Sequence, residues 1–588
     1  MTEMTLATAP TGPRAQLAIV AGYALVAVAM TYPLILHVGT AIPSERGPMD
    51  VFSFIWNNWW VQRALVSLHQ NPYVTDAVFA PFRVDLRLHT LGLLYGILWT
   101  PVFTTLGPVG VLNTQAILTP VLNGWAGYCL GSYVAGERRA GAIAGLLIAA
   151  TPAINFHVLS GRPSCAAAWP LLLAMYFLLR LIDRPSFAVA VALATSLIAL
   201  FLSDQQMTMF GLIWLAVLCG AAAVRGRLTR RGVIALLGVG AAVAVPFVWL
   251  YVLTSAVSEY TIPAAFEAQT YSYPIALLWS PAMIWRAYGV VLPAMLLVAA
   301  WRARGDRELL VWAGAAAAFV LLSFGPVEPR TGVPLPFAAL RELPGMAQFR
   351  TPYRFQLPAA IGLAIASAIV VRRMAADRQR LAVAVLVAVT AVDVIGQRVV
   401  RGFALSTMPD EPVYTEIGRD PRDVLVLEVP FGVRTGTDRI GPGEEFNFYQ
   451  PIHRKRMING MLARAPLAAL AFYRASPAFM FLAEEAAPDR AVVVEDLQRK
   501  LRDLRVGYVV MHADRVDSHW RASFVEALAS VPELERFESG RSETISYRVK
   551  QHDLPARSET ALLIAQDSTP QAARISHGPP NSSAKASK

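Results

Sequence analysis

Long apolar runs recur along most of this chain, and they restrict it to one kind of architecture. From the N-terminus to about Gly396, apolar runs follow one another with short, arginine-containing loops between them. The runs are roughly 17–24 residues long, enough for a helix to cross the hydrocarbon core of a bilayer. Only 16% of the 588 residues are charged, whereas about 25% is typical of soluble proteins. The sequence therefore predicts a mainly α, polytopic transmembrane helix bundle.

Arginine clusters predict how the bundle is oriented. The clusters at 225–231, 302–307 and 372–380 mark cytoplasmic loops by the positive-inside rule, and Arg14 places the N-terminus on the same side. Successive loops fall on the side of the membrane that their arginines require only if residues 88–107 do not cross it. Pro101 favours a broken segment there, either re-entrant or interfacial. About eleven spans are then expected, near 16–37, 111–135, 140–157, 165–182, 187–203, 208–224, 232–254, 286–302, 308–323, 357–371 and 381–396.

The composition divides the chain into four parts. We expect a cytoplasmic tail at 1–15, a transmembrane domain at 16–400 with an outer first loop at 38–110, and a small extracytoplasmic α/β domain at 401–552. In the α/β domain, 423–432, 505–512 and 543–550 are predicted strands, and 488–504 is a predicted helix that Asp489 caps. The polar residues 553–588 are expected to be disordered.

Several classes of function lack sequence support. The net charge of +11 does not indicate a nucleic-acid partner, because most arginines fall in loops that the positive-inside rule explains. No P-loop, dinucleotide-binding glycine motif, HExxH or CxxC occurs, and the three cysteines have no metal-binding spacing. We therefore expect no metal ligands and no cofactor, although a need for a divalent cation stays open.

The first loop contains the strongest catalytic candidate. Residues 44–90 mix three aspartates with aromatic residues, arginines and histidines, which places them outside the lipid. Asp50 precedes the aromatic stretch 51–68, which predicts a helix along the membrane surface with tryptophans at headgroup level. The positive end of that helix stabilises a carboxylate, which can accept a proton from a hydroxyl or an amine. The alternative is that Asp50 only caps the helix.

Other candidates are spread over the expected outer side. They are Asp85, His89, His157, Arg162 and Asp204. An acid at the end of a span, such as Asp204, is a functional candidate by default, and the alternative is a solvated loop residue. An exposed salt-bridged turn is the alternative for Asp85, and a structural hydrogen bond is the alternative for His157.

The loop 324–356 departs from the charge rule. It is expected outside, yet FRTPYRF brings Arg350 and Arg354 directly to the next span. Arginine matches the geometry of phosphate oxygens, so a lipid phosphate is the natural partner. Ordinary contact with lipid headgroups is the alternative.

Together these features resemble the GT-C superfamily of integral-membrane glycosyltransferases. The likeness lies in one span, a long outer first loop with an early acid, a non-crossing apolar segment, many further spans and an outer C-terminal domain. The pieces NPYVTDAVFAPFRVDLRLHT, FRTPYRF, LEVPFG, FYQPIHRKRMINGMLARAP and LRDLRVGYVVMH are similar to poorly characterised bacterial GT-C-like and YfhO-like membrane proteins. Val51 stands where the family often has a second acid, and SCAAAWP replaces an expected early aspartate in the fourth span.

The resemblance implies an inverting transferase in the bacterial inner membrane. It would move a sugar from a polyprenyl-phosphate donor to an envelope glycan, lipid or protein on the outer face. By the resemblance, Asp50 is the base. In the hypothesis built on it, Asp85 or Asp204 is an orienting acid, Arg350 and Arg354 hold the lipid phosphate, and His89, His157 and Arg162 are further substrate contacts. The alternatives are a transporter or flippase of a lipid-linked glycan, which predicts charges buried mid-span and internal repeats, and a non-catalytic envelope assembly protein.

Overall fold

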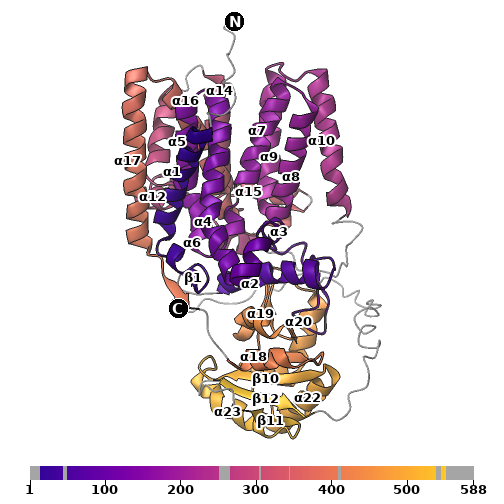
Figure 1. Ribbon diagram of the computed structural model, residues 1–588. Helices are drawn as coiled ribbons and strands as arrows, with labels where there is room; N and C mark the ends of the chain where they lie inside the picture. Colours follow the sequence, from indigo (N-terminus) through magenta and orange to yellow (C-terminus); the bar gives the residue numbers. More distant parts are fainter. Residues whose placement is uncertain are drawn as a thin grey trace.

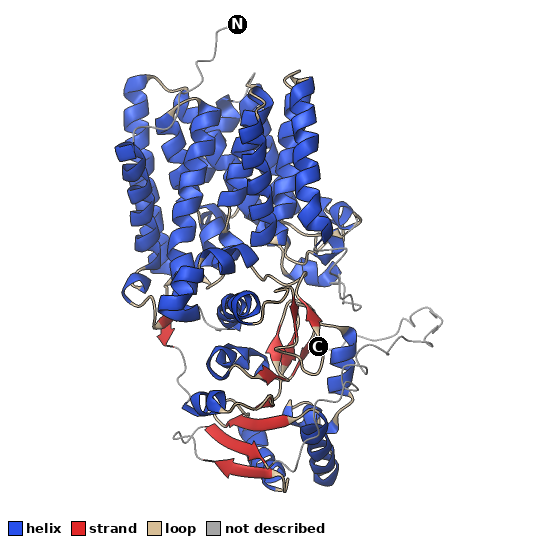
Figure 2. Cartoon of the chain, turned by 45° about the vertical axis from the view of Figure 1, so that its right-hand side comes forward, coloured by secondary structure: helices blue, strands red, loops and turns tan. Residues whose placement is uncertain are grey.

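A long helix bundle and a smaller region of mixed helix and sheet make up the molecule. The computed structural model describes residues 13–43, 49–249, 265–302, 306–343, 345–407, 412–537 and 544–550. The bundle occupies one end, and the strands gather at the other (Figures 1 and 2). Helix α2 (Met49–Gln62) and the short helices α19 (Gln450–His453) and α20 (Leu467–Arg474) lie between the two ends (Figure 1).

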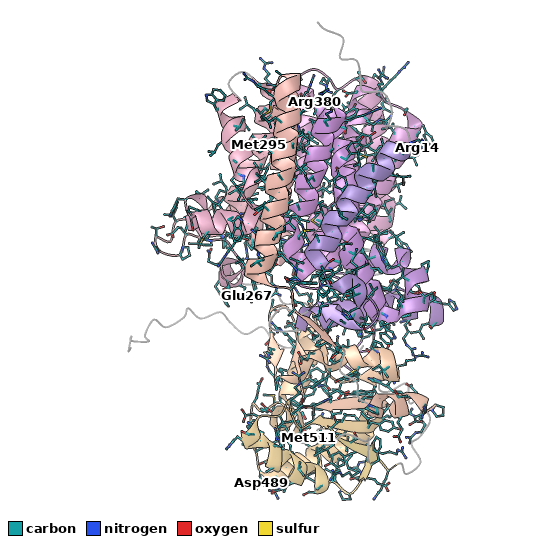
Figure 3. The ribbon with its side chains drawn as sticks, turned by 60° about the vertical axis from the view of Figure 1, so that its left-hand side comes forward. Arg14, Glu267, Met295, Arg380, Asp489 and Met511 are labelled. Carbon is teal, nitrogen blue, oxygen red and sulfur yellow. The ribbon has the colours of Figure 1, made fainter. Side chains whose placement is uncertain are left out.

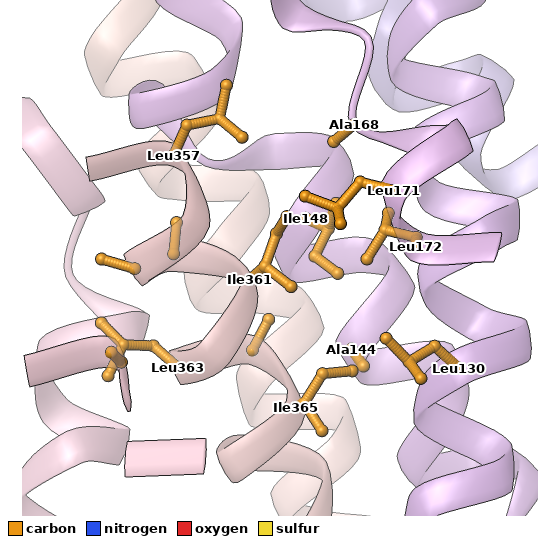
Figure 4. Packing of buried hydrophobic residues seen from close by; sticks show 14 of the residues in the cluster. Leu130, Ala144, Ile148, Ala168, Leu171, Leu172, Leu357, Ile361, Leu363 and Ile365 are labelled. Atoms are coloured by element: carbon orange, nitrogen blue, oxygen red, sulfur yellow. The ribbon is translucent and has the colours of Figure 1, made fainter. Parts of the chain in front are cut away.

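The bundle is built from helices that coincide with the apolar runs of the sequence. Its members are α1 (Pro13–Thr31), α4 (Thr100–Ala135), α5 (Arg138–Ala150), α6 (Pro152–Leu159), α7 (Trp169–Asp183), α8 (Phe187–Ser203), α9 (Gln205–Val224), α10 (Arg230–Val248), α12 (Pro281–Tyr288), α13 (Val291–Arg302), α14 (Arg307–Leu322), α16 (Gln356–Arg372) and α17 (Ala376–Arg401). Helix α16 is central, and its apolar window is completely buried. Figure 4 shows its Ile361 and Ile365 among side chains of neighbouring helices, including Ala144 and Ile148 of α5.

The chain is a multi-pass membrane protein. Within the described residues, six helices are long and apolar enough to cross a membrane, or up to eight if each of two bent helix pairs forms one span. The bent pairs are α5 with α6 (42°) and α12 with α13 (102°). Other expected spans fall on shorter apolar helices such as α8, which has 17 residues. The count of eleven therefore stays a prediction.

Residues 88–107 do not form a single crossing helix. They contain α3 (Leu93–Leu98) and the first residues of α4, and non-helical backbone angles at Gly107 (φ 65°, ψ −172°) separate those residues from the rest of α4. Helix α3 packs against α2 and α8 at the end of the bundle nearest the sheet (Figure 1). The segment thus stays at this end, as a broken helix.

The five-stranded sheet has strand order β11-β12-β10-β5-β8. Parallel strands β5 (Leu425–Val429), β8 (Arg456–Met457) and β10 (Val506–His512) are extended by antiparallel β12 (Thr544–Val549) and β11 (Leu534–Phe537). Helices α22 (Arg490–Asp503) and α23 (Ser518–Ala529) accompany them. The three predicted strands and the predicted helix are confirmed, and the Asp489 carboxylate accepts the Ala491 N–H at 2.8 Å as the expected cap.

Smaller elements complete the described chain. They are the strands β1 (Ala41–Pro43), β2 (Val74–Thr75), β3 (Val84–Asp85), β4 (Leu405–Thr407), β6 (Val433–Arg434), β7 (Arg439–Ile440) and β9 (Gly460–Met461), and the helices α11 (Ala265–Thr270), α15 (Pro336–Arg341), α18 (Pro412–Arg419) and α21 (Pro477–Leu482). Strand β1 pairs with β4, which ties the first loop to the chain that follows α17. The expected tail at 553–588 lies outside the described residues.

Helix α2 is covered by protein on the side that carries its tryptophans. Trp56, Trp59 and Trp60 are buried, and the Trp56 indole N–H donates to Oε1 of Gln450 at 2.6 Å. Phe52 stacks on Phe448 with ring centroids 4.0 Å apart. The Trp60 indole N–H donates to the Pro72 carbonyl at 2.9 Å. The expectation that these tryptophans face lipid headgroups is therefore wrong, because other parts of the protein cover them.

Two arginines of the expected cytoplasmic side lie at one end of the bundle. Figure 3 shows Arg14 and Arg380 at the end far from the sheet, whereas Met511 and Asp489 lie at the opposite end of the molecule. Glu267 of α11 lies at the end of the bundle that is nearer the sheet (Figure 3). The α11 region and the sheet are thus on the same side of the bundle.

Asp393 lies inside α17, yet its carboxylate has a structural task. One oxygen accepts the Trp285 indole N–H at 2.6 Å, and the other accepts the Val290 N–H at 3.0 Å. Val290 stands at the 102° bend between α12 and α13, where a backbone N–H lacks its helical partner. The carboxylate supplies an acceptor for that donor at the bend.

We predict that Asp393→Ala destabilises the bundle by about 1–3 kcal/mol, because two donors lose their acceptor. Asp393→Asn is expected to cost less, since its amide oxygen still accepts one of them. Thermal unfolding of the detergent-solubilised protein measures both changes. Equal unfolding temperatures for the wild type and the alanine variant would contradict this role.

Candidate functional site

Asp50 forms an ion pair across two segments that are far apart in sequence. It lies in the first turn of α2, and its Oδ2 is 2.9 Å from Nη1 of Arg162. The Asp50 side chain is 55% exposed and the Arg162 side chain 18% exposed. The arginine is fixed further by the Phe156 ring, whose centroid is 5.2 Å from Cζ. Asp50 is thus an oriented carboxylate that faces solvent.

A glycine allows this pair to form. Gly161 has φ +69°, a left-handed conformation that favours glycine. A Cβ atom at this position would lie 2.6 Å from Cγ2 of Val51, the neighbour of Asp50. The turn after α6 can therefore approach α2 closely enough to bring Arg162 to Asp50.

A second ion pair, between Asp204 and Arg354, is buried. Oδ2 of Asp204 is 3.0 Å from Nη2 of Arg354, and the two side chains are 3% and 6% exposed. The other Asp204 oxygen accepts the Met207 N–H at 2.8 Å and so caps α9. Arg354 also donates to Oε1 of Gln206 at 2.7 Å and to the Cys165 carbonyl at 3.2 Å. This pair joins the corner between α8 and α9 to the start of α16.

His157 and Tyr353 connect the two ion pairs. Their rings stack with centroids 5.9 Å apart, and His157 is buried. His157 is close enough to Arg162 and Arg354 to interact electrostatically with both, and Tyr353 interacts with these arginines and with Asp50. The structure therefore brings five of the predicted residues into one cluster: Asp50, His157, Arg162, Asp204 and Arg354. Within it, the buried atoms His157 Nδ1, Arg162 Nε and Arg354 Nε have no hydrogen-bond partner among the described residues.

Asp85 has no exposed carboxylate. Its side chain is 1% exposed, and its Oδ2 is 2.6 Å from Nη2 of Arg87. Its Oδ1 accepts the Arg87 backbone N–H at 2.8 Å. Asp85 therefore stabilises a buried turn after strand β3, and the alternative of an exposed salt-bridged turn is wrong because the pair is buried.

Both ring nitrogens of His89 take part in hydrogen bonds. Nδ1 accepts the Ala463 N–H at 3.0 Å, so the neutral ring carries its proton on Nε2, which donates to Oδ1 of Asn57 at 2.8 Å. Burial lowers the pKa of His89 to about 3. His89 thus links α2 to the segment before α20 as a neutral histidine.

Arg350 lies apart from the two ion pairs. It donates to the Gly436 carbonyl, and its Cζ is 4.9 Å from the centroid of the Tyr271 ring. Beside it is Arg464, which is 5% exposed and was not singled out from the sequence. Arg464 belongs to the piece FYQPIHRKRMINGMLARAP, but only the fold shows that it reaches Arg350.

The described residues contain no group of three or more His, Cys, Asp and Glu side chains that could hold a metal ion. The cluster around Asp50 and Asp204 instead balances each carboxylate with one arginine. Such a site can orient a base and position polar groups, but its carboxylates do not converge.

No family model matches the sequence, and no curated protein is similar to it in sequence. The fold does have solved counterparts. The arabinofuranosyltransferase AftD from Mycobacteria superposes with a TM-score of 0.53 over 93% of this chain, at 16% identity. The chain has the GT-C fold. At this identity the likeness establishes the fold and leaves the reaction open.

Two further GT-C structures match less well. ArnT from Cupriavidus metallidurans, bound to undecaprenyl phosphate, has a TM-score of 0.48 at 11% identity, covering 93% of this chain and 100% of that one. AglB from Archaeoglobus fulgidus, in complex with an inhibitory peptide and a dolichol-phosphate, has a TM-score of 0.39 at 14% identity, covering 92% and 75%. The chain spans only 40% of the length of AftD. The similarity to YfhO-like proteins stays an expectation.

We predict that Asp204→Asn destabilises the protein by about 3–5 kcal/mol, because it leaves the Arg354 guanidinium buried without a counter-charge. Asp423→Asn is the matched control, since Asp423 is 59% exposed in its pair with Arg456 and is expected to cost no more than about 1 kcal/mol. Thermal unfolding in detergent compares the two. Similar losses of stability in both variants would show that the buried pair contributes no more to stability than the exposed pair does.

The neutral state of His89 predicts a pH dependence of stability. Its pKa is about 3 when folded and about 6.5 when unfolded, so the unfolded chain binds the proton first as the pH falls below about 6.5. Protonation of the unfolded chain therefore lowers the free energy of unfolding by about 2 kcal/mol at pH 5. His89→Gln is expected to reduce the difference in stability between pH 7.5 and pH 5, whereas the exposed His519→Gln is not. An unchanged pH difference in His89→Gln would show that this histidine is protonated in the fold.

Proposed function

We propose that this protein is an inverting membrane glycosyltransferase, which moves a sugar from a polyprenyl-phosphate donor to an envelope glycan, lipid or protein. Asp50 is the base in this proposal. The GT-C fold supports it, and AftD, the structure with the TM-score of 0.53, is an arabinofuranosyltransferase.

The exposed fractions of the three predicted acids are the reason for choosing Asp50 as the base. Its side chain is 55% exposed, whereas those of Asp85 and Asp204 are 1% and 3% exposed. A general base must come within hydrogen-bond reach of the proton that it removes. Of these three carboxylates, only that of Asp50 is open to an incoming acceptor.

In the proposed reaction, Asp50 accepts the proton of the acceptor hydroxyl or amine as its oxygen or nitrogen attacks the anomeric carbon. The bond between that carbon and the phosphate oxygen breaks, and the electron pair leaves with the polyprenyl phosphate. Arg162 holds the carboxylate in its orientation from the side. Asp204 acts indirectly, because it holds Arg354, and with it the start of α16, in position.

The proposed topology follows the charge pattern. Eleven spans would leave the N-terminus in the cytoplasm and both the first loop and the α/β domain outside a bacterial inner membrane. The separation of Arg14 and Arg380 from the sheet along the bundle supports this orientation (Figure 3). A transporter predicts charges buried mid-span, whereas Asp393 is near the end of an expected span and its carboxylate already serves the bend between α12 and α13.

Asp50→Asn tests the proposal. In a strain that lacks this protein, the wild-type gene is expected to restore an envelope glycan that Asp50→Asn does not restore, at equal membrane levels of protein. The asparagine variant is expected to lose about 10²–10⁴-fold in transfer rate, because it cannot accept the proton. Mass spectrometry of envelope glycans measures the product. Asp76→Asn is the control, since Asp76 is a 45% exposed acid of the same loop.

Unchanged glycan in the Asp50→Asn strain would overturn the assignment of the base. An envelope that does not change even when the whole protein is absent would overturn the transferase itself.

A further inference from the structure

Two guanidinium groups meet at Gly436, in the turn between β6 and β7. A Cβ atom at Gly436 would lie 2.6 Å from Nη1 of Arg464 and 3.2 Å from Cζ of Arg350. Arg350 comes from the loop before α16, and Arg464 comes from the segment before α20. Two arginines that are 114 positions apart in sequence (464 less 350) therefore both lie next to Gly436.

Neutral acceptors hold Arg464 in place. Its Nη1 donates to the Ala463 carbonyl at 2.6 Å, its Nη2 donates to the Gln348 carbonyl at 3.0 Å, and its Nε donates to Oε1 of Gln348 at 3.4 Å. These contacts use three of the five N–H donors of the guanidinium. Within the described parts of the chain, neither Arg464 nor Arg350 forms an ion pair with a carboxylate.

The charge around the two arginines is only partly balanced. Burial, followed by repulsion from Arg350, lowers the pKa of Arg464 to about 10, and attraction to Glu267 opposes the shift. Glu267 Oε2 is itself buried without a hydrogen-bond partner among the described residues. Among the described residues, these two cations and one acid leave one positive charge, whereas the pairs Asp50–Arg162 and Asp204–Arg354 are each neutral.

Several segments of the proposed site converge on this position. The Ala463 carbonyl accepts the Gly436 N–H at 2.8 Å, and the Ala463 N–H reaches His89 of the first loop. On the other side, Thr351, the neighbour of Arg350, donates its hydroxyl to Oε1 of Gln206 at 2.8 Å. Gln206 also binds Arg354. The arginine pair is thus linked both to the first loop and to the buried ion pair.

We propose that Arg350 and Arg464 together bind the phosphate of the polyprenyl donor, so that the chain after β9 completes the donor site. Arginine forks match phosphate oxygens and form strong charge-assisted hydrogen bonds. Arg354 does not serve as a phosphate ligand in this arrangement, because the Asp204 carboxylate already neutralises its charge. The inference rests on the proposed transferase function.

Lipid binding to the full-length protein in detergent tests the pair. The probes are undecaprenyl phosphate, undecaprenol, which lacks the phosphate, and inorganic phosphate. Arg464→Gln and Arg350→Gln are each expected to weaken binding of undecaprenyl phosphate at least tenfold, and Arg464→Lys is expected to weaken it less, because lysine keeps the charge without the fork. Arg548→Gln is the control, since Arg548 lies on β12 and is 46% exposed.

Binding of undecaprenol is expected to be equal in all variants. The proposed phosphate site would be overturned if Arg464→Gln and Arg350→Gln bound undecaprenyl phosphate as tightly as the wild type does. It would also be overturned if the binding of undecaprenol weakened to the same extent. Inorganic phosphate that binds as tightly as the lipid would assign the pair to free phosphate and overturn the donor assignment. If Arg464→Gln fails to fold, Arg350→Gln and Arg464→Lys decide the matter at unchanged unfolding temperature.

Binding and transfer are read separately. Asp50→Asn is expected to bind undecaprenyl phosphate normally, because no contact joins Asp50 to the pair among the described residues. Full transfer by Asp50→Asn would overturn the proposed base and leave the arginine pair as a lipid-phosphate site. Normal binding by Arg464→Gln would overturn the pair and leave the transferase proposal standing.

Discussion

The buried ion pair between Asp204 and Arg354 is the interaction on which the proposed site depends. Removing two charges from water is expensive, and the attraction between them offsets that cost only when the geometry is good and further hydrogen bonds are made. Here one Asp204 oxygen caps α9, and Arg354 has additional acceptors in Gln206 and Cys165. The corner between α8 and α9 and the start of α16 are therefore held in one arrangement, against which His157 and the turn carrying Arg162 are placed.

Charge balance separates two regions that a list of polar residues would merge. The cluster around Asp50 and Asp204 pairs each acid with one arginine, so it suits the orientation of a base and has no spare cation. In the described part of the chain, the region around Gly436 has two arginines and one nearby acid, so it suits an anion. A transferase that uses a lipid phosphate needs both properties close together, and the contacts of Gln206 and Thr351 connect them.

Local patterns in the sequence predict much of the fold. Apolar runs fall on helices, alternating or buried β-branched runs fall on β5, β10 and β12, and Asp489 caps α22 as its position suggests. Asp50 at the start of a first-loop helix is also a local feature, since one acid precedes a long aromatic stretch. Periodicity and capping depend on residues within a few positions of one another, which is why they can be read directly.

Long-range pairing could not be read in this way. Asp204 and Arg354 are 150 positions apart, and Arg464 reaches Arg350 only because the turn at Gly436 brings two distant segments together. The burial of Trp56 has the same origin, because Gln450 accepts its indole N–H. No local pattern distinguishes an arginine that neutralises a buried acid from one that leaves a positive charge.

The position of the phosphate in a structure of the full-length protein with undecaprenyl phosphate tests the account most directly. The account predicts phosphate density in contact with both Arg350 and Arg464, with the Asp204–Arg354 pair intact. Density on Arg354, with Asp204 displaced from it, would contradict the account.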